Sequence, residues 1–423
     1  MKDFIKKFVF GTLKMLAKIR LKRLRLFVIG ITGSIGKTST KDAIATVLSS
    51  KYKISKSDKS FNTEFGMPLA ILGQESGFSS ASKWTKILLS ALYNAFFGGR
   101  DIQIMILEMG VDKPGDMDLL LNIVKPQVGI FTNVKPVHLD EGQFKDLEDI
   151  FNEKKKLLVT LPEKGTAIMN LDDPYVSLLK DKLHSKVLTY GFSEMADLRV
   201  SDVKHSMEGL AFTISYKDET VTSSIALLGA FQVYVILPAI AAALTQGFSL
   251  EEAVEALKEF KLPPGRMNPI PGIKDSLIID SSYNASPEAV KNAIDILTES
   301  PGRKIAVIGN MNELGDYTIP KHREVGMYMA DKVDMFFTVG EYAKASAEAA
   351  IEKGFSDKNV FSFQDPIEAS KKLHTIIAPG DTILVKGSQN KVRLEKLVKK
   401  IMKEPERANE LLARQGSEWE KIN

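Results

Sequence analysis

Residues 27–42 read FVIGITGSIGKTSTKD, and this stretch predicts a strand, a glycine-rich turn and the start of a helix. The apolar, β-branched run at residues 26–31 is typical of a buried parallel strand. Gly33 and Gly36 let backbone N–H groups approach an anion closely, and the following helix adds the dipole of its N-terminus. The stretch therefore predicts a cradle for phosphate groups.

Two side chains give this cradle the chemistry of a nucleoside triphosphate site. We expect Lys37 to reach the β- and γ-phosphates and the Thr38 hydroxyl to ligate Mg²⁺. The strict Walker pattern places a glycine five residues before Gly36, where this chain has Ile31. We interpret the stretch as a shortened variant; a glycine-rich turn with an incidental lysine is the alternative.

Length and composition narrow the class of protein. A chain of 423 residues suggests two or three domains, and 44% hydrophobic with 26% charged residues is ordinary for a globular protein. The absence of cysteine excludes disulfides, Cys-ligated zinc and thiol catalysis, and it indicates a reducing compartment, which we take to be the cytoplasm. The net charge of +4 is too small to indicate a nucleic-acid partner.

The charge is concentrated at the N-terminus. Residues 1–25 hold nine Lys and Arg against Asp3 alone, with apolar residues between them. No uncharged run approaches the roughly 18 residues that a spanning helix needs, and no cleavage signature of a signal peptide is present. One interpretation is a basic amphipathic helix on the anionic inner face of the membrane; the other is a helix packed on the domain with a solvated basic face.

Apolar strands alternating with helical patterns predict an α/β fold with a parallel sheet. Residues 187–225 instead resemble short antiparallel strands at one edge. Pro263, Pro264 and Gly265 break the chain, and a second α/β unit follows. We expect a basic helix at 1–25, a P-loop ATP-binding domain at 26–262, a Rossmann-like domain at 263–402 and a polar helical tail at 403–423.

Two further polar residues follow apolar strands. Glu108 ends the run IQIMILE, and His138 follows PQVGIFTNVKPV. Ligands collect at the carboxyl ends of parallel strands, so the phosphate cradle, Glu108 and His138 are expected to share one edge. A carboxylate and an imidazole beside nucleotide phosphates can hold a divalent metal.

The residues together resemble the Mur ligase family, and within it the branch that adds D-alanyl-D-alanine to a UDP-N-acetylmuramoyl-tripeptide. The resemblance runs in the family's order from about residue 27 to about residue 400. The matching stretches read GITGSIGKTST, SFNTEFGMPL, LEMGVDKPGDM, TNVKPVHL, LPEKGTAIMNLDD, GRMN, IDSSYNASPEAV, VIGNMNELGDYTIPKHREVG and ILVKGSQNKVRLEKLV.

The resemblance implies an ATP-binding domain, a C-terminal α/β domain that closes on it, and ATP-driven peptide-bond formation through an acyl phosphate. It implies catalytic roles for Lys37, Lys154 and His138, and a metal site of Thr38, Glu108, His138 and Lys154. It implies ATP contacts by Gly33, Ser34, Ile35, Gly36, Lys37, Thr38 and Ser39, with Arg266 and Asp280 handling nucleotide in the closed state. It implies substrate contacts by Asn62, Tyr283, Asn284 and His322.

The family also has a carbamylated lysine, whose added negative charge holds a second Mg²⁺. Counting back from LPEKGTAIMN places it at Lys154. The usual small residue before it is Glu153 in this chain. The alternative is that Lys154 is one of three surface lysines on a solvated helix.

The chain departs from the family pattern in three places. Its phosphate loop begins near residue 30, so the usual N-terminal domain that binds the uridine nucleotide is expected to be missing. Ile35 stands where the family usually has Asn. The family's His-Asn pattern after a glycine is replaced by Phe231, Gln232 and Val235. The last two departures weaken the prediction of adenine contacts and leave the prediction of phosphate contacts unchanged.

Three functions stay open on the sequence. The first is an ATP-dependent amide ligase of cell-wall peptide synthesis, with a muramoyl-peptide acceptor and D-Ala-D-Ala. The second is a ligase like folylpolyglutamate synthase, although Thr38-Ser39 and SYNASP favour the Mur branch. The third is a membrane-associated nucleotide-binding scaffold, against which Lys37, Glu108, His138 and Lys154 argue.

Overall fold

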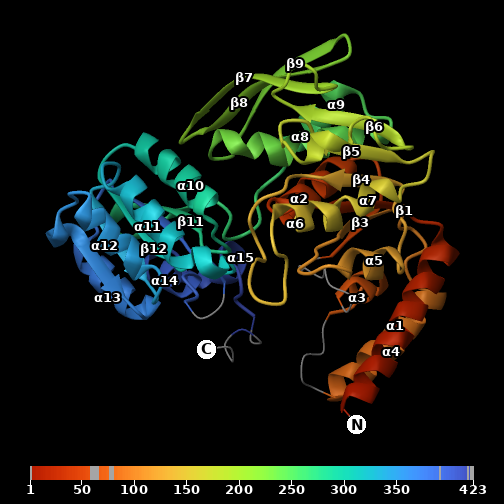
Figure 1. The fold of residues 1–423 in the computed structure, drawn as a ribbon, viewed down its shortest axis with the longest axis horizontal. Coiled ribbons are helices and arrows are strands. Elements are labelled where there is room, and N and C mark those ends of the chain that lie inside the picture. Colours follow the sequence, from red (N-terminus) through yellow and green to blue (C-terminus); the bar gives the residue numbers. More distant parts are fainter. Residues whose placement is uncertain (1, 58–65, 76–80, 390–391, 417–418, 420–423) are drawn as a thin grey trace. The chain divides into compact units, whose positions relative to one another are not determined.

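The computed structural model describes residues 2–57, 66–75, 81–389, 392–416 and 419, and the chain divides into two compact units (Figure 1). The first unit comprises Met1–Val203, Phe212–Ser224 and Val233–Phe260. The second comprises Lys204–Ala211, Ile225–Gln232 and Lys261–Asn423. Both are built on a largely parallel sheet with helices, which confirms the predicted α/β class.

A nine-stranded sheet organises the first unit, in the order β2-β3-β1-β4-β5-β6-β7-β8-β9. Strand β1 (Phe27–Thr32) lies between β3 (Ile104–Glu108) and β4 (Val128–Phe131) and pairs parallel with both. The remaining strands are β2 (Ile54–Lys56), β5 (Thr166–Asn170), β6 (Lys186–Gly191), β7 (Leu198–Ser206), β8 (Gly209–Tyr216) and β9 (Glu219–Ile225). The stretch that predicted a buried strand is therefore central in its sheet.

The edge at residues 187–225 differs in part from the prediction. Strand β6 pairs parallel with both β5 and β7. Just before β7, the Asp197 carboxylate accepts hydrogen bonds from Thr189 N at 2.8 Å and Thr189 Oγ1 at 2.7 Å, which holds the start of β7 beside β6. Strands β7, β8 and β9 follow through two-residue connections, as antiparallel hairpins do. Only these last three strands match the predicted antiparallel edge.

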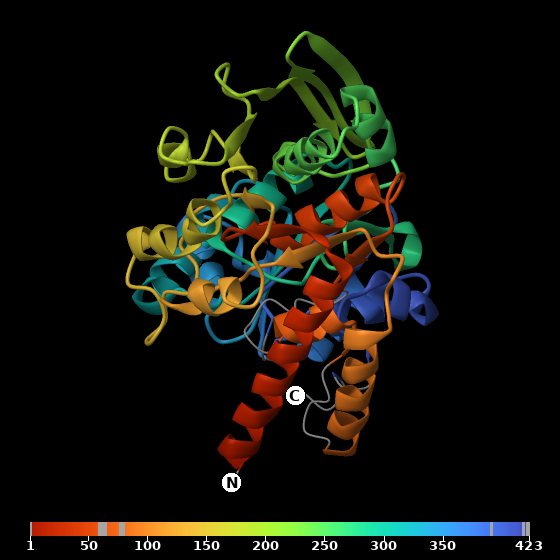
Figure 2. The same cartoon turned by 90° about the vertical axis from the view of Figure 1, so that its right-hand side faces the viewer.

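Helices cover both faces of this sheet (Figures 1 and 2). One face carries α2 (Lys37–Leu48), α8 (Val233–Thr245) and α9 (Leu250–Leu257). A core of buried side chains on the other face includes members of α3 (Gly66–Leu72), α5 (Asp116–Leu121), α6 (Leu147–Lys154) and α7 (Lys156–Val159). The same core receives side chains from α1 (Lys2–Leu24) and α4 (Ala81–Phe96).

Helix α1 packs on the first unit. This agrees with the interpretation of residues 1–25 as a helix packed on the domain. Leu13, Leu16 and Ala17 are buried against α3 and α4. From residue 8 onward, where the side chains of α1 are described, the exposed residues are Phe8, Gly11, Met15, Lys18 and Lys22, which recur every three or four positions along one stripe. Within the described parts of the chain, no helix combines the length and apolar character that crossing a bilayer requires.

The second unit holds a six-stranded sheet in the order β10-β11-β15-β12-β13-β14, parallel except for the β10–β11 pair. Its strands are β10 (Asn268–Pro271), β11 (Leu277–Ser281), β12 (Lys304–Gly309), β13 (Met335–Val339), β14 (Val360–Phe363) and β15 (Thr382–Lys386). Its helices are α10 (Pro287–Glu299), α11 (Thr318–Met329), α12 (Lys344–Glu352), α13 (Pro366–Ile376), α14 (Glu395–Ile401) and α15 (Ala408–Leu411).

Short 3₁₀ turns complete the two units. They are Val176–Leu179, Ala230–Gln232, Ile273–Asp275, Gly315–Tyr317, Asp357–Asn359 and Pro405–Arg407. Within the described residues of the tail that was expected to be helical after residue 402, the helical elements are the last of these turns and α15. Its Ala408 and Leu412 join the core of the second unit.

Replacing Gly326 with alanine is expected to destabilise the second unit. The new Cβ would lie 2.0 Å from the Ser346 carbonyl oxygen, so α11 and α12 would have to move apart, at a cost of about 1–3 kcal/mol. Gly11→Ala is the matched control, because a Cβ there has no neighbour within 4 Å and the exposed helical position gains up to about 1 kcal/mol. Urea unfolding measures both, and an unchanged G326A midpoint would contradict the close packing.

Candidate active site

The glycine-rich turn lies at the carboxyl edge of the first sheet, between β1 and α2. Ile31 pairs with Glu108 at the end of β3, and Thr32 pairs with Phe131 at the end of β4. The parallel register therefore brings the turn, Glu108 and the loop after β4 to one edge, as the sequence predicted. His138 lies in that loop.

The turn depends on its two glycines. Gly33 has φ +147°, and a Cβ there would lie 1.9 Å from Thr132 Oγ1. Gly36 has φ +90° and precedes the first residue of α2. A side chain at the first position would push the turn off β4, and one at the second would strain the backbone.

Asn133 fixes the turn from the neighbouring strand. Its Oδ1 accepts a hydrogen bond from Ile35 N at 2.9 Å, its Nδ2 donates to Ile35 O at 3.0 Å, and its carbonyl accepts from Ser34 N at 3.0 Å. Ser34 Oγ donates to Lys135 O at 3.1 Å. The backbone of Ile35 is held through its peptide groups, so the departure from Asn at this position leaves the turn intact.

Lys37 folds back over the turn. Its Nζ donates to Gly33 O at 2.7 Å and to Ser34 O at 3.2 Å. The ammonium therefore lies at the mouth of the cradle, where phosphate oxygens can replace these carbonyl acceptors.

Thr38 and Glu108 meet as predicted. Thr38 Oγ1 donates to Glu108 Oε2 at 3.2 Å, while Lys41 Nζ lies 3.1 Å from Glu108 Oε1 and donates to Ser57 O at 2.6 Å. The Lys41 and Glu108 side chains are each about 1% exposed. The buried pair orients the carboxylate toward Thr38, although such pairs add little net stability. Lys41, which lies one helical turn after Lys37 on α2, was not among the residues predicted from the sequence.

His138 faces a different carboxylate. It has φ +58°, and its Nε2 lies 3.6 Å from Asp112 Oδ1 in the loop after β3. Across the described residues, the side chains of His, Asp and Glu form no group of three or more suited to hold a metal ion. The structure thus brings Thr38 to Glu108 and His138 to Asp112.

Lys154 ends α6 inside the first unit. Its side chain is fully buried, and its Nζ has no hydrogen-bond partner among the described residues. Burial holds the pKa of the amine well below its ordinary value, and the Lys37 ammonium lowers that pKa further; Asp112, Glu153 and Asp116 oppose the shift. Lys154 is therefore no surface lysine, and its amine is disposed to be neutral close to the charges of the candidate site.

The two lysines that follow Lys154 have partners elsewhere, so of the three only Lys154 has a buried amine without a hydrogen-bond partner. Lys155 lies over the Phe151 ring, 5.1 Å from its centroid, and Lys156 Nζ lies 2.8 Å from Glu153 Oε2 and 2.6 Å from Asp118 Oδ2. Glu153 Oε1 also accepts from Met117 N at 2.7 Å. Glu153, an unusual residue for this position, therefore secures the start of α5 and pairs with Lys156.

In the second unit, Arg266, Asp280 and Tyr283 lie near the start of the domain. The Arg266 and Arg414 guanidinium groups lie over the Tyr283 ring, 4.3 and 4.8 Å from its centroid. Asp280 is fully buried, which raises the pKa of its carboxyl to about 6. Arg414 also donates to the Tyr283 carbonyl and forms an ion pair with buried Glu395 at 3.2 Å. The tail thus braces the loop that carries Tyr283.

Lys386, at the end of β15, is a second buried amine that the sequence analysis missed. Its Nζ donates to Ser281 Oγ and to Asn284 O, each at 3.0 Å. Burial, with the nearby Arg266 charge, lowers the pKa of Lys386 to about 7, and Asp280 opposes the shift. A polar residue that ends an apolar strand, here in DTILVKGS, was the available signal.

Two further residues were predicted to contact substrate, His322 and Asn62. His322 is fully buried, its Nε2 accepts from Met311 N at 2.9 Å, and its Nδ1 lies 2.6 Å from Thr318 O. Both ring nitrogens have partners, so His322 supports the loop after β12, and its contact with substrate stays a prediction. Asn62 lies outside the described residues.

Known proteins share this architecture. Residues 31–243 match the Mur ligase middle domain, and residues 265–389 match the Mur ligase, glutamate ligase domain. The UDP-N-acetylmuramoyl-tripeptide–D-alanyl-D-alanine ligase of Bacillus subtilis is 33% identical over 397 residues, which are 93% of this chain and 79% of that protein.

Solved structures have the same fold as this chain. The MurF ligase of Thermotoga maritima in complex with ADP has a TM-score of 0.76 at 28% identity, covering 94% of this chain and 84% of that chain. Folylpolyglutamate synthase from Mycobacterium tuberculosis has a TM-score of 0.64 at 15% identity, covering 89% of this chain and 92% of that chain, and shares the fold alone.

Lys386→Met is expected to flatten the pH dependence of stability. Because folding lowers the pKa of Lys386 to about 7, the unfolded chain holds a proton that the folded chain lacks between that pH and the ordinary pKa of 10.5. Wild-type stability then rises with pH across this window, by up to about 1.4 kcal/mol per pH unit. Urea unfolding from about pH 7 to about pH 10 measures the slope. Lys399→Met, at an exposed lysine of the same unit, is the control that keeps the slope.

Proposed function

The chain belongs to the Mur ligase family, and we propose that this ATP-dependent ligase joins D-Ala-D-Ala to the free carboxylate of a muramoyl-tripeptide in peptidoglycan precursor synthesis. The observation that carries the proposal is the preformed turn at Gly33–Thr38, with Lys37 at its mouth and Glu108 beside Thr38. The relatives named for this reaction are its second support.

The reaction needs a carboxylate to become an acyl donor. A carboxylate oxygen attacks the γ-phosphorus of ATP, ADP leaves, and an acyl phosphate forms. The amine of D-Ala-D-Ala then attacks the acyl carbon, a proton is lost, and inorganic phosphate leaves as the amide forms. In this chain, the backbone of the glycine turn and the Lys37 ammonium would hold the transferring phosphate and stabilise its charge.

Magnesium is part of the proposal. Thr38 Oγ1 and Glu108 Oε2, 3.2 Å apart beside the cradle, are the oxygen donors that Mg²⁺ prefers. When bound there, Mg²⁺ would offset the repulsion between the attacking carboxylate and the triphosphate, worth several kcal/mol. Lys41 would keep the other oxygen of Glu108 in place. His138, paired with Asp112, would act from the neighbouring loop.

Lys154 has the properties that carbamylation requires. A neutral amine adds to CO₂ to give a carbamate and one proton, and burial near Lys37 favours the neutral amine. The product replaces an unpartnered buried nitrogen with two carboxylate oxygens and a negative charge beside Lys37. We infer that these oxygens would hold the second Mg²⁺ that the resemblance to the Mur ligases implies.

Roles in the second unit are proposed on the same basis. Arg266 and Asp280 would handle nucleotide in the closed state, and Tyr283 and Asn284 would contact substrate. Their support is the braced loop at Tyr283, where Arg266 and Arg414 lie over the ring and Lys386 holds the Asn284 carbonyl.

Lys154→Ala is expected to lower the rate of amide formation by about 10²-fold or more, because the site loses a charge that neutralises phosphate repulsion. Lys155→Ala and Lys156→Ala are matched controls on the same turns and should retain most activity, since both side chains have partners outside the cradle. Carbon-13 NMR after equilibration with labelled bicarbonate should show a carbamate signal in wild type and both controls. A signal that persists in K154A would refute the assignment.

The choice among functions depends on the acceptor. Mass spectrometry after incubation with ATP should find ligated product with muramoyl-tripeptide and D-Ala-D-Ala, and none with a folate and glutamate. Lys37→Ala should lower product formation by about 10²-fold or more, because the triphosphate loses its cation. Full product formation by K37A would refute the catalytic assignment of Lys37, whereas a wild-type chain that forms no product with either acceptor would support the nucleotide-binding scaffold.

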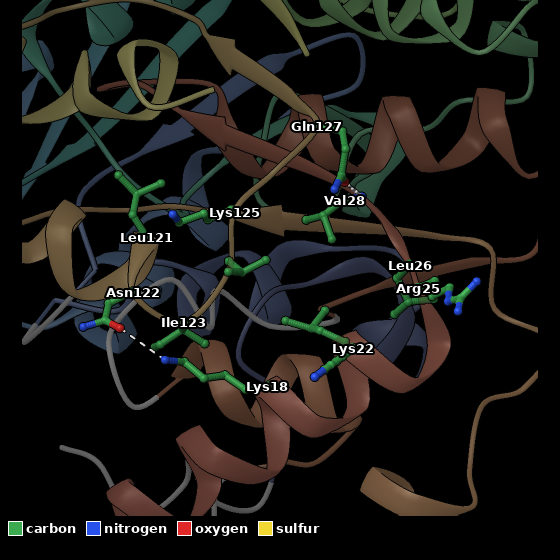
Figure 3. A pocket seen from close by; sticks show the side chains of 12 residues that line it. Lys18, Lys22, Arg25, Leu26, Val28, Leu121, Asn122, Ile123, Lys125 and Gln127 are labelled. Atoms are coloured by element: carbon green, nitrogen blue, oxygen red, sulfur yellow. Dashed lines mark hydrogen bonds between the residues drawn. The ribbon is translucent and has the colours of Figure 1, made fainter. Parts of the chain in front are cut away.

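Peripheral contact of residues 1–25 with the anionic inner face of the membrane belongs to the same proposal. Figure 3 shows Lys18 and Lys22 of α1, with Arg25 after it, around a pocket of about 600 Å³ that Lys125 also lines. Of the described residues that line this pocket, none is acidic. Four cations around one hollow would suit the phosphate of a lipid headgroup.

Changing Lys18, Lys22 and Arg25 to Gln should weaken binding to vesicles that contain anionic lipid, by about 1 kcal/mol for each charge at low salt. Deleting the segment would be a poor test, because Leu13, Leu16 and Ala17 belong to the core. Co-sedimentation with anionic and with neutral vesicles measures the effect. Equal binding by the variant and wild type would contradict the contact.

A further inference from the structure

Helix α4 carries a row of exposed apolar side chains that the fold does not use. Leu89, Tyr93 and Phe97 are 64%, 61% and 60% exposed, and Leu92 and Phe96 are also exposed. The rings of Tyr93 and Phe97 lie 5.7 Å apart, and those of Phe96 and Phe97 lie 6.4 Å apart. These five residues, the apolar face of α4, form a continuous patch rather than scattered side chains, and such patches mark interaction sites.

The charged residues within the segment that carries this face have one sign. The segment 81–100 reads ASKWTKILLSALYNAFFGGR, with Lys83, Lys86 and Arg100 and no acidic residue. The neighbouring segment 1–25 has nine basic residues and Asp3. Apolar and aromatic side chains flanked by Lys and Arg are the composition of elements that lie in a membrane interface.

The two helices are joined along their lengths. Arg23 of α1 donates to the carbonyls of Ala95 at 2.9 Å and Asn94 at 3.3 Å, and also to that of Gly98. Ala91 and Ala95 of α4 are buried in the core that contains Leu13, Leu16 and Ala17 of α1. Figures 1 and 2 show the pair projecting side by side from the first unit, with both N-terminal ends farthest from the sheet.

We propose that α4 is the hydrophobic anchor that seats the first unit on an anionic lipid surface, beside the cations of α1. This proposal rests on the peripheral membrane contact proposed for residues 1–25. It assigns the apolar part of that contact to α4. Tyr93, Phe96 and Phe97 enter the interface between headgroups and acyl chains, while Lys83, Lys86 and Arg100 remain at headgroup level.

The charge distribution favours lipid over a second copy of the chain. A symmetric dimer through this face would bring two basic segments together and repel itself, because the same patch meets its own copy. An anionic bilayer neutralises those charges and covers the apolar side chains at the same time. The two contributions differ in salt dependence, since charge attraction is screened and apolar burial is not.

The test is co-sedimentation of the full chain with anionic vesicles at low and at high salt. The variant Leu89→Gln, Tyr93→Gln, Phe97→Gln should lose the binding that survives high salt, with a partition coefficient at least about tenfold lower than wild type. The variant Lys18→Gln, Lys22→Gln, Arg25→Gln should lose mainly the salt-sensitive part. Leu178→Gln with Met195→Gln is the matched control, because these side chains are 52% and 74% exposed elsewhere on the unit.

A second readout reports how close α4 comes to lipid, through Trp84, which packs partly buried against the core beside the apolar face. The sequence has two tryptophans, and Trp84 lies on α4, so Trp419→Phe leaves Trp84 as the single reporter. Brominated lipids should quench its fluorescence in wild-type background and not with the three α4 changes. Ligase activity with soluble substrates should be unchanged in the α4 variant, which shows that the chain is folded.

The possible outcomes distinguish the α4 anchor from the charge contact of α1 and from the ligase function. If the α1 variant weakens binding and the α4 variant does not, the anchor is wrong and the charge contact stands. If wild type binds no vesicle, both fail while the ligase assay is unaffected. If light scattering shows a wild-type dimer that the α4 changes dissociate, without lipid binding, the face is an interface between copies and the anchor is overturned.

Discussion

The approach of the β1–α2 turn to strand β4 is the constraint on which the site depends. At Gly33 no Cβ fits, because Thr132 Oγ1 occupies its place 1.9 Å away. This contact lets the Asn133 side chain reach both peptide groups of Ile35, so contacts within the protein hold the shape of the turn. Once the turn is fixed, the parallel register of β1 and β3 places Glu108 beside Thr38. The position of each proposed phosphate or metal contact follows from that packing.

The charges around the glycine turn suit an anion in the cradle. Lys37, Lys41 and Lys154 lie in or beside it, while Glu108 is the carboxylate that pairs with Lys41. Burial and Lys37 together keep the pKa of Lys154 low, so the protein limits its own positive charge by disfavouring one proton. A triphosphate would supply negative charge in a preorganised site. A carbamate on Lys154 would then turn a suppressed cation into a metal ligand.

How much of this could be predicted follows from what local sequence encodes. The strand, the glycines and Lys37-Thr38 are contiguous, and Glu108 ends its own strand, so their shared edge follows from parallel pairing alone. The burial of Lys154 could not be read locally, because it depends on how α6 packs while Lys155 and Lys156 find partners outside. The burial of His322 could not be predicted for the same reason, because it depends on how α11 packs and not on the local sequence. The parallel β6–β7 pair required the Asp197 contact with Thr189, which no periodicity reveals.

The topology also separates the two ends of the first unit. Helix α1 leads into the amino end of β1, and α4 precedes the amino end of β3, whereas the glycine turn and Glu108 lie at the carboxyl ends of the same strands. A strand of six residues spans about 20 Å, so a lipid surface at one edge and a nucleotide at the other would not compete for space. Because the sheet is rigid, seating α1 and α4 would orient the cradle away from the bilayer, toward ATP in solution. The N-terminal helices can therefore set where the reaction takes place without taking part in it.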